Sequence, residues 1–149
     1  MGYILAMVGL ALMVGLAGCG SAVGTSIVGS ATLGMYKKKP DKFGNGMILT
    51  AVPGTQGLYG FVGFFLYNSV ITPNFTLFQG CVVLGAGIAM GLACFISGIW
   101  QGKVCANGVA AIGDGHEVFG NTMILAAFPE FYAILSLIAA ILMQGLLKL

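Results

Sequence analysis

Long hydrophobic runs separated by short polar breaks form the main pattern of this chain. Four such runs cover residues 3–33, 44–69, 78–111 and 119–147. Each exceeds the ~20 residues that an α-helix needs to cross a bilayer. The breaks contain turn-forming residues, in the stretches YKKKPDKFG (36–44), ITPNF (71–75) and GDGHE (113–117). The pattern predicts an all-α membrane protein with four transmembrane helices.

The composition supports a membrane environment. Of the 149 residues, 58% are hydrophobic and only 7% are charged. A soluble domain of this length needs far more charge on its surface. The 25 glycines lie within the apolar runs rather than in polar linkers, as is typical of helices that pack closely in a bilayer. These numbers exclude an ordinary soluble enzyme.

The breaks also predict the topology. Connections this short favour an antiparallel up-down order, which brings both termini to one side. Four lysines crowd the first break, at Lys37, Lys38, Lys39 and Lys42. The opposite side offers little beyond Lys148. Because lysines collect on the cytoplasmic side, we expect loops 34–43 and 112–118 in the cytoplasm and both termini outside.

The sequence repeats itself. The segment FGNGMILTAVPGTQGLYG, which begins at Phe43, matches FGNTMILAAFPEFYAILS, which begins at Phe119. At the same offset, VGLALMVGLA (8–17) matches LGAGIAMGLA (84–93). The chain is therefore interpreted as two tandem helical hairpins, residues 1–77 and 78–149. In this alignment Glu130 falls opposite Gly54.

Three polar residues are predicted to lie at one depth. Gln56 and Glu130 each follow the start of their helix by about eleven residues, and Gln101 precedes the end of the third helix by a similar distance. At ~1.5 Å per residue, all three lie roughly 15–18 Å from the cytoplasmic ends. A carboxylate at that depth costs roughly 2.5–3.5 kcal/mol on insertion scales, so it indicates a functional site.

The second predicted helix adds oxygen atoms to this layer. One of its faces, at spacing i, i+3, i+4 and i+7, carries Val52, Thr55, Gln56 and Tyr59. Pro53 and Pro129 lack N–H groups, so the carbonyls of Leu49 and Leu125 lose their helical partners. We expect the backbone to loosen near both prolines, as in broken membrane helices that coordinate cations.

These residues form a candidate cation site. Its oxygen donors are the Glu130 carboxylate, the Gln56 and Gln101 amides, the Thr55 hydroxyl and the Val52 carbonyl. Hard, small cations require several oxygen ligands, so this set favours Na⁺. A proton site needs only a carboxyl group and one partner, and H⁺ is the alternative. Interhelical hydrogen bonding, worth ~0.6–2 kcal/mol per contact, explains any single residue but not their clustering around the acid.

An ion pair within the chain is not expected at Glu130. Lys103 is the one lysine near that depth, but it lies two residues after Gln101 and therefore about 200° around the helix. The chain contains no arginine. If the empty site needs a permanent cation, another chain must supply it.

Three motifs resemble one family over the whole chain: VPGTQGLYG, WQGKVCANG and FPEFYAIL. Together they are similar to the four-helix proteolipid of V-type ATPases, especially the bacterial sodium-pumping form called the c or K subunit. The resemblance implies a rotor ring of identical copies in the cell membrane, each copy carrying one ion. It assigns the ion ligands to Glu130, Gln101, Gln56, Thr55 and the Val52 carbonyl, where the family has a leucine. It gives Tyr59 the role of hydrogen-bonding the carboxylate.

The resemblance also implies partners and a mechanism. A stator subunit supplies an arginine, central-stalk subunits contact loops 34–43 and 112–118, lipid surrounds the ring, and no nucleic acid is involved. ATP hydrolysis elsewhere drives rotation, and this chain, which lacks a P-loop, is not the catalyst. A four-helix multidrug-type transporter is the rival interpretation. In that class the acid lies in the first helix, whereas here it lies in the last.

Overall fold

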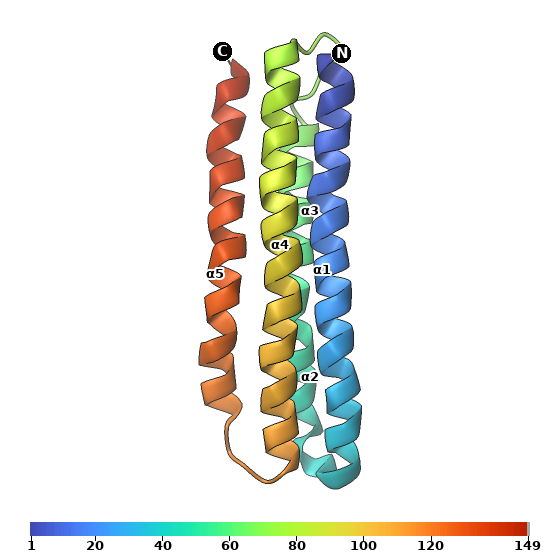
Figure 1. The fold of residues 1–149 in the computed structure, drawn as a ribbon, viewed down its shortest axis with the longest axis vertical. Coiled ribbons are helices and arrows are strands. Elements are labelled where there is room, and N and C mark those ends of the chain that lie inside the picture. The colour runs from blue at the N-terminus through green and yellow to red at the C-terminus, as the bar shows by residue number, and fades with distance from the viewer. Residues whose placement is uncertain (149) are drawn as a thin grey trace.

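The computed structural model describes residues 1–148, which form four long helical columns (Figure 1). The first column is α1 (Gly2–Lys38) and the third is α4 (Leu77–Gly113). The second consists of α2 (Phe43–Ala51), the 3₁₀ segment η2 (Val52–Gly54) and α3 (Thr55–Asn68). The fourth is α5 (Phe119–Gln144), continued by η3 (Gly145–Lys148). Residue 149 of the predicted second hairpin lies outside the described residues.

The prediction of four membrane helices is confirmed. Within residues 1–148, three helices are individually long and apolar enough to cross a membrane: Gly2–Lys38, Leu77–Gly113 and Phe119–Lys148. The second column does not count as a single long helix because η2 divides it. The N- and C-terminal ends lie at the same end of the molecule (Figure 1), as the antiparallel order predicts.

The connections at the opposite end are shorter than predicted. Helix α1 continues to Lys38 and α4 to Gly113, so residues 34–38 and 112–113 of the expected loops are helical. Lys37 and Lys38 lie in the last turn of α1, where positive charge interacts favourably with the helix dipole. Pro40 then begins the short 3₁₀ segment η1 (Pro40–Lys42). The polar turns at this end, here called the loop end, are residues 39–42 and 114–118.

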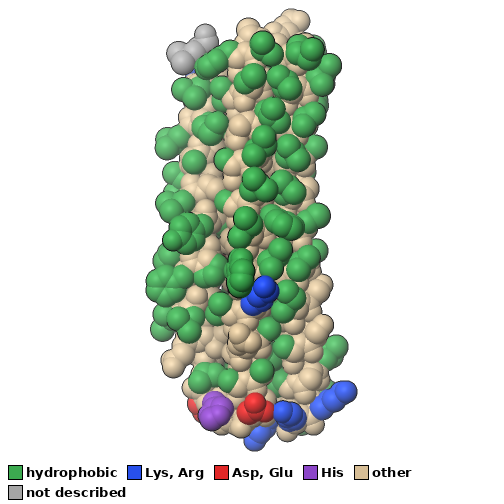
Figure 2. All heavy atoms as spheres, viewed as in Figure 1, with side chains coloured by type: hydrophobic (Ala, Val, Ile, Leu, Met, Phe, Trp, Pro, Cys, Tyr) green, Lys and Arg blue, Asp and Glu red, His purple; other side chains and the backbone are tan. Residues whose placement is uncertain are grey.

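Two ion pairs join the first hairpin to the turn 114–118 at the loop end. Lys38 Nζ lies 2.8 Å from Asp114 Oδ1, and Lys42 Nζ lies 2.9 Å from Glu117 Oε1. The hydrogen bond and charge of Lys38 lower the pKa of Asp114, and those of Glu117 raise the pKa of Lys42. Figure 2 shows charged side chains gathered at this end, below a surface that is mostly hydrophobic. The pairs connect the two hairpins outside the apolar part of the molecule.

Glycines bring α1 and α4 into direct backbone contact. A Cβ atom added to Gly102 would lie 2.6 Å from the Cα of Gly24, and one added to Gly20 would lie 2.5 Å from the Cα of Phe95. Real Cβ atoms do not approach other atoms this closely, so any side chain would push the helices apart. Small residues permit such contact in membranes, where van der Waals packing rather than the hydrophobic effect holds helices together.

The interior consists of two apolar clusters with a polar layer between them. The cluster towards the termini includes Leu10, Met13, Ala17, Tyr67, Val83, Met90, Cys94 and Ala133. The cluster towards the loop end includes Val28, Met35, Leu49, Cys105, Val109, Ile112 and Ala126. Between them along the helices lie four buried polar residues: Ser21, Gln56, Ser97 and Gln101. Glutamines 56 and 101 therefore share one depth, as the helix registers predict.

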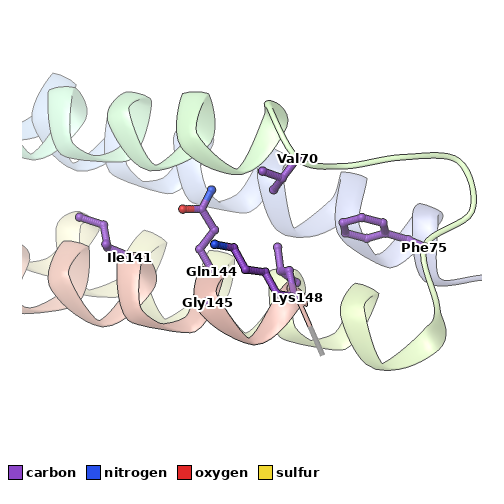
Figure 3. Close-up of a pocket in the computed structure, with 7 residues that line it drawn as sticks. Val70, Phe75, Ile141, Gln144, Gly145 and Lys148 are labelled. Atoms are coloured by element: carbon purple, nitrogen blue, oxygen red, sulfur yellow. The ribbon is translucent and has the colours of Figure 1, made fainter.

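Hydrogen bonds fix α3 beside α5 at the end that carries the termini. The Tyr67 hydroxyl donates to the Ala140 carbonyl at 2.6 Å, and Gln144 Nε2 donates to the Leu66 carbonyl at 2.8 Å. Figure 3 shows Gln144 and Lys148 extending from the fourth column into a hollow of about 470 Å³ that Val70 also lines. These contacts hold the second and fourth columns at a fixed distance some turns away from Glu130.

We predict that Gly102→Ala destabilises the protein by about 1–3 kcal/mol, the usual cost of overpacking, because the added methyl group meets the backbone of Gly24. Gly34→Ala is the matched control, since a Cβ at Gly34 meets nothing within 4 Å. Thermal unfolding of both purified variants in detergent measures the difference. Equal stability of the two variants would show that the backbone contact is not needed.

Candidate functional site

Glu130 lies on α5, and both of its carboxylate oxygens accept hydrogen bonds. The Tyr59 hydroxyl on α3 donates to Oε1 at 2.7 Å. Gln101 Nε2 on α4 donates to Oε2 at 3.1 Å. The side chain is half-buried, and its partners come from two other columns. All the donors are neutral, so the carboxylate has no permanent counter-ion among the described residues.

Gln101 connects the carboxylate to the rest of the polar layer. The residue is fully buried. Its Nε2 atom also donates to the Ala126 carbonyl at 2.8 Å, and its Oε1 atom accepts from Gln56 Nε2 at 2.7 Å. Every polar atom of this amide therefore has a partner, which fixes its orientation between Glu130 and Gln56.

Gln56 is also fully buried, but its oxygen is less well satisfied. Its Nε2 atom donates to Gln101 and, at 3.1 Å, to Ser97 Oγ. Its Oε1 atom accepts only from the Thr55 hydroxyl, at 3.4 Å, which is long for such a bond. The same hydroxyl donates to the Val52 carbonyl at 3.0 Å. Gln56 Oε1 therefore retains capacity to accept.

The structure thus joins all six predicted site residues in one hydrogen-bonded network. It runs in order through Val52, Thr55, Gln56, Gln101, Glu130 and Tyr59. Carboxylate, amide, hydroxyl and carbonyl oxygens are the ligands that hard cations prefer. The described residues contain no cluster of three or more His, Cys, Asp or Glu side chains suited to a transition metal. The roles of the six residues in ion binding stay predictions.

Pro53 changes the backbone as expected, whereas Pro129 does not. Around Pro53 the chain forms the 3₁₀ segment η2, in which the Val52 carbonyl accepts from the Thr55 N–H. Helix α5 runs through Pro129 without interruption. The 3₁₀ break seen at Pro53 therefore has no counterpart at Pro129, although Pro129 has no N–H to give to the Leu125 carbonyl. The α5 carbonyls that reach the site belong instead to Ala126 and Pro129, which accept from Gln101 and Ser97.

Sequence reasoning missed two serines that support the site. Ser97 Oγ accepts from Gln56 and donates to the Pro129 carbonyl at 2.8 Å. Ser21 Oγ accepts from the Gly57 N–H at 2.7 Å, just beyond the 3₁₀ segment. The sequence does contain an indication of their importance, because Ser21 and Ser97 occupy equivalent positions in the internal repeat. Ser97 also lies one turn before Gln101 on the same helical face.

Lys103 does not pair with Glu130. Its ammonium group lies 3.9 Å from the ring centre of Trp100, and both side chains are exposed. The angular separation from Gln101 that the sequence predicts is therefore confirmed. Since the two ion pairs in residues 1–148 both lie at the loop end, the membrane-spanning part of this chain offers Glu130 no cation.

Comparison with known proteins shows the family. The sequence model of the ATP synthase C subunit family matches the chain twice, over residues 8–67 and 84–143. The two matches have the same offset as Phe43 and Phe119, so the predicted duplication is confirmed.

Among curated relatives, the A-type ATP synthase subunit K of Methanocaldococcus jannaschii is 39% identical over 94% of this chain, which spans 61% of that protein's length. The V-type sodium ATPase subunit K of Enterococcus hirae is 37% identical over 95% of this chain and 91% of its own length. A V-type proton ATPase subunit of Saccharomyces cerevisiae is 28% identical over 87% of this chain and 86% of its own length. The chain therefore belongs to the ATP synthase C subunit family, as a non-catalytic membrane proteolipid in which the family's helical hairpin occurs twice.

Proposed function

We propose that this chain is the ion-carrying subunit of a V-type ATPase rotor ring and that each copy carries one Na⁺ at Glu130. The observation that carries the proposal is the network that surrounds this carboxylate with neutral side chains. The names of two relatives, a V-type sodium ATPase subunit and a V-type proton ATPase subunit, include the two candidate cargo ions, Na⁺ and H⁺.

The number of oxygen atoms around Glu130, rather than its hydrogen-bond donors, favours Na⁺ over H⁺. A protonated carboxyl group needs one acceptor for its own proton, which the Tyr59 hydroxyl could provide by reversing its bond, while the Gln101 N–H group donates to the other oxygen. The Gln56 oxygen and the Val52 carbonyl add acceptors that a cation requires and a proton does not. We therefore assign the Na⁺ ligands to Val52, Thr55, Gln56, Gln101 and Glu130, with H⁺ as the alternative cargo.

Electrostatics then gives the transport cycle. With Na⁺ bound, the site is neutral overall and can face lipid at a tolerable cost. The empty site is an anion that must meet water or a cation. Because this chain has no arginine, a stator subunit supplies the cation. Identical copies form a closed ring, and ATP hydrolysis in other subunits turns the ring past the stator.

The loop end is the proposed contact with the central stalk. Its turns, residues 39–42 and 114–118, present Lys39, Asp41 and His116, and the two ion pairs lie beside them. We place this end in the cytoplasm and both termini outside the cell membrane, because four of the six lysines gather near the first turn.

We predict that a hydrophobic carbodiimide modifies Glu130 and stops ion transport. Carbodiimides attack protonated carboxyl groups, so bound Na⁺ should slow the modification at fixed pH, whereas K⁺ should not. Mass spectrometry of labelled rings measures the rate with each salt. A rate that does not respond to Na⁺ would indicate a proton site.

We further predict that Gln56→Leu and Gln101→Leu each weaken Na⁺ binding by roughly ten- to hundredfold. Loss of one ligand from a desolvated cation should cost at least the ~1–3 kcal/mol of an unmet buried partner, and ~1.4 kcal/mol corresponds to tenfold. Binding of ²²Na⁺ to isolated rings measures the affinity. Rings of both variants should still assemble, because glycine and apolar packing hold the helices.

Gln144→Leu is the control for interhelical hydrogen bonding. Gln144 bonds the Leu66 carbonyl at the end that carries the termini, away from Glu130. Its loss should lower thermal stability and leave Na⁺ affinity unchanged. The assignment of Gln56 and Gln101 as ligands fails if their variants behave as Gln144→Leu does.

A further inference from the structure

Both N–H groups of the Gln56 side-chain amide are used within the protein. Nε2 lies 2.7 Å from Gln101 Oε1 and 3.1 Å from Ser97 Oγ. An amide held by one hydrogen bond can still rotate about that bond, whereas two bonds from the same nitrogen fix its plane. The other atom of the amide, Oε1, therefore lies on the opposite side, next to the Thr55 hydroxyl.

The Ser97 hydroxyl can only accept from Gln56. A hydroxyl group has a single proton, and that of Ser97 goes to the Pro129 carbonyl, 2.8 Å away. A backbone carbonyl cannot donate, so the direction of this bond is fixed. Only lone pairs of Ser97 Oγ remain for Gln56, and they bind an N–H group and repel an amide oxygen.

Gln101 approaches Gln56 under the same restriction. Its Nε2 atom donates to the Ala126 carbonyl at 2.8 Å and to Glu130 Oε2 at 3.1 Å, which uses both of its protons. Only Oε1 is left for Gln56. Ala126 and Pro129 both belong to α5. Two backbone carbonyls of α5 thus set the direction of both hydrogen bonds that the Gln56 nitrogen makes.

Ser97 and Gln56 are both buried. Ser97 is 5% exposed and Gln56 is 0% exposed. Among the described residues, Gln56 Nε2 has these two acceptors and no third one. Without the Ser97 hydroxyl, one N–H group of a buried amide loses its acceptor. Gln101 alone then holds the amide, which becomes free to rotate and to turn Oε1 away from the site.

We propose that Ser97 is a positioning residue of the ion site, which holds the Gln56 amide so that Oε1 faces the cation. It acts through Gln56 and is not itself a ligand. This role rests on the proposed function, because it concerns one of the oxygen atoms assigned to Na⁺. The equivalent serine of the first hairpin, Ser21, accepts from the Gly57 N–H instead. The role therefore belongs to the second hairpin alone.

The test uses carbodiimide labelling of purified rings at fixed pH, which yields two quantities. The labelling rate without Na⁺ depends on the Glu130 carboxyl group itself, and the Na⁺ concentration that halves this rate reports the affinity. We expect Ser97→Ala to raise that concentration by about three- to tenfold, the factor that one neutral hydrogen bond supplies. The rate without Na⁺ should not change, because Tyr59 and Gln101 still donate to Glu130.

Ser136→Ala is the matched control. The Ser136 hydroxyl also donates to a backbone carbonyl of α5, that of Ala133 at 2.7 Å, but it bonds to none of the proposed ligands. Its loss should leave both quantities unchanged. A double variant, Ser97→Ala with Gln56→Leu, tests whether Ser97 acts through Gln56. It should bind Na⁺ as weakly as Gln56→Leu alone, because the two changes remove one shared interaction.

Different outcomes would overturn the proposal in different ways. Unchanged Na⁺ affinity in Ser97→Ala would show that Gln101 alone holds the amide. Losses that multiply in the double variant, or an altered rate without Na⁺, would show that Ser97 supports the helices in general rather than Gln56. If Na⁺ does not slow labelling of the unmodified protein, the proposed function fails and this role fails with it. The unmodified protein therefore separates the two kinds of failure.

Discussion

The structure depends on a single constraint, which is that a carboxylate inside the hydrocarbon must find all its partners within the protein. Glu130 takes one donor from Tyr59 on α3 and one from Gln101 on α4. Gln101 is in turn fixed by Gln56, and Gln56 by Ser97. Each step satisfies a buried polar group that would otherwise cost roughly 1–3 kcal/mol. Among the described residues, no buried side-chain nitrogen or oxygen lacks a partner. The network is therefore complete without an ion, while Gln56 Oε1, held only by a long bond, remains free enough to accept one.

The glycine contacts of α1 and α4 make this network possible. The two helices touch backbone to backbone near Gly24 and Gly102, which flank the polar layer on one side, while Gly20 and Phe95 do so on the other. This approach sets the position of Ser21, which accepts from the Gly57 N–H of the second column. Packing between α1 and α4 thereby fixes where the 3₁₀ segment lies, and with it the Val52 carbonyl and the Thr55 hydroxyl. The site is made of polar side chains, but apolar contacts determine its geometry.

The sequence predicted the fold and the site residues for different reasons. Four helices followed from hydrophobic length, and a shared depth for Gln56 and Gln101 followed from helix rise, because both depend on local geometry alone. The end of α1 differs from the prediction because lysines can continue a helix whose dipole they stabilise, so the lysines at 37–39 do not by themselves mark a loop. Helix α4 continues to Gly113 without a basic residue in its last turn. The uninterrupted course of α5 through Pro129 and the support from Ser21 and Ser97 depend on contacts between columns. Hydrophobic periodicity contains no information on these contacts, although the repeat placed the two serines at equivalent positions.

The repeat also explains why the chain has one acid in the membrane rather than two. Gly54 is the counterpart of Glu130, and a Cβ at Gly54 would meet only Thr25 Cγ2, at 3.9 Å. There is therefore room for the first atom of a side chain at Gly54. Hydrogen-bond donors for a carboxylate are missing there, because the counterparts of Gln101 and Tyr59 are Thr25 and Leu135. The Thr25 hydroxyl already donates to the Ser21 and Ala22 carbonyls, and Leu135 cannot donate at all. A carboxylate at Gly54 would have no free donor on these two positions, and its burial would cost the full penalty that the network removes at Glu130. Both hairpins thus contribute to one site: the first supplies Thr55, Gln56 and Tyr59, and the second supplies Gln101 and the Glu130 carboxylate.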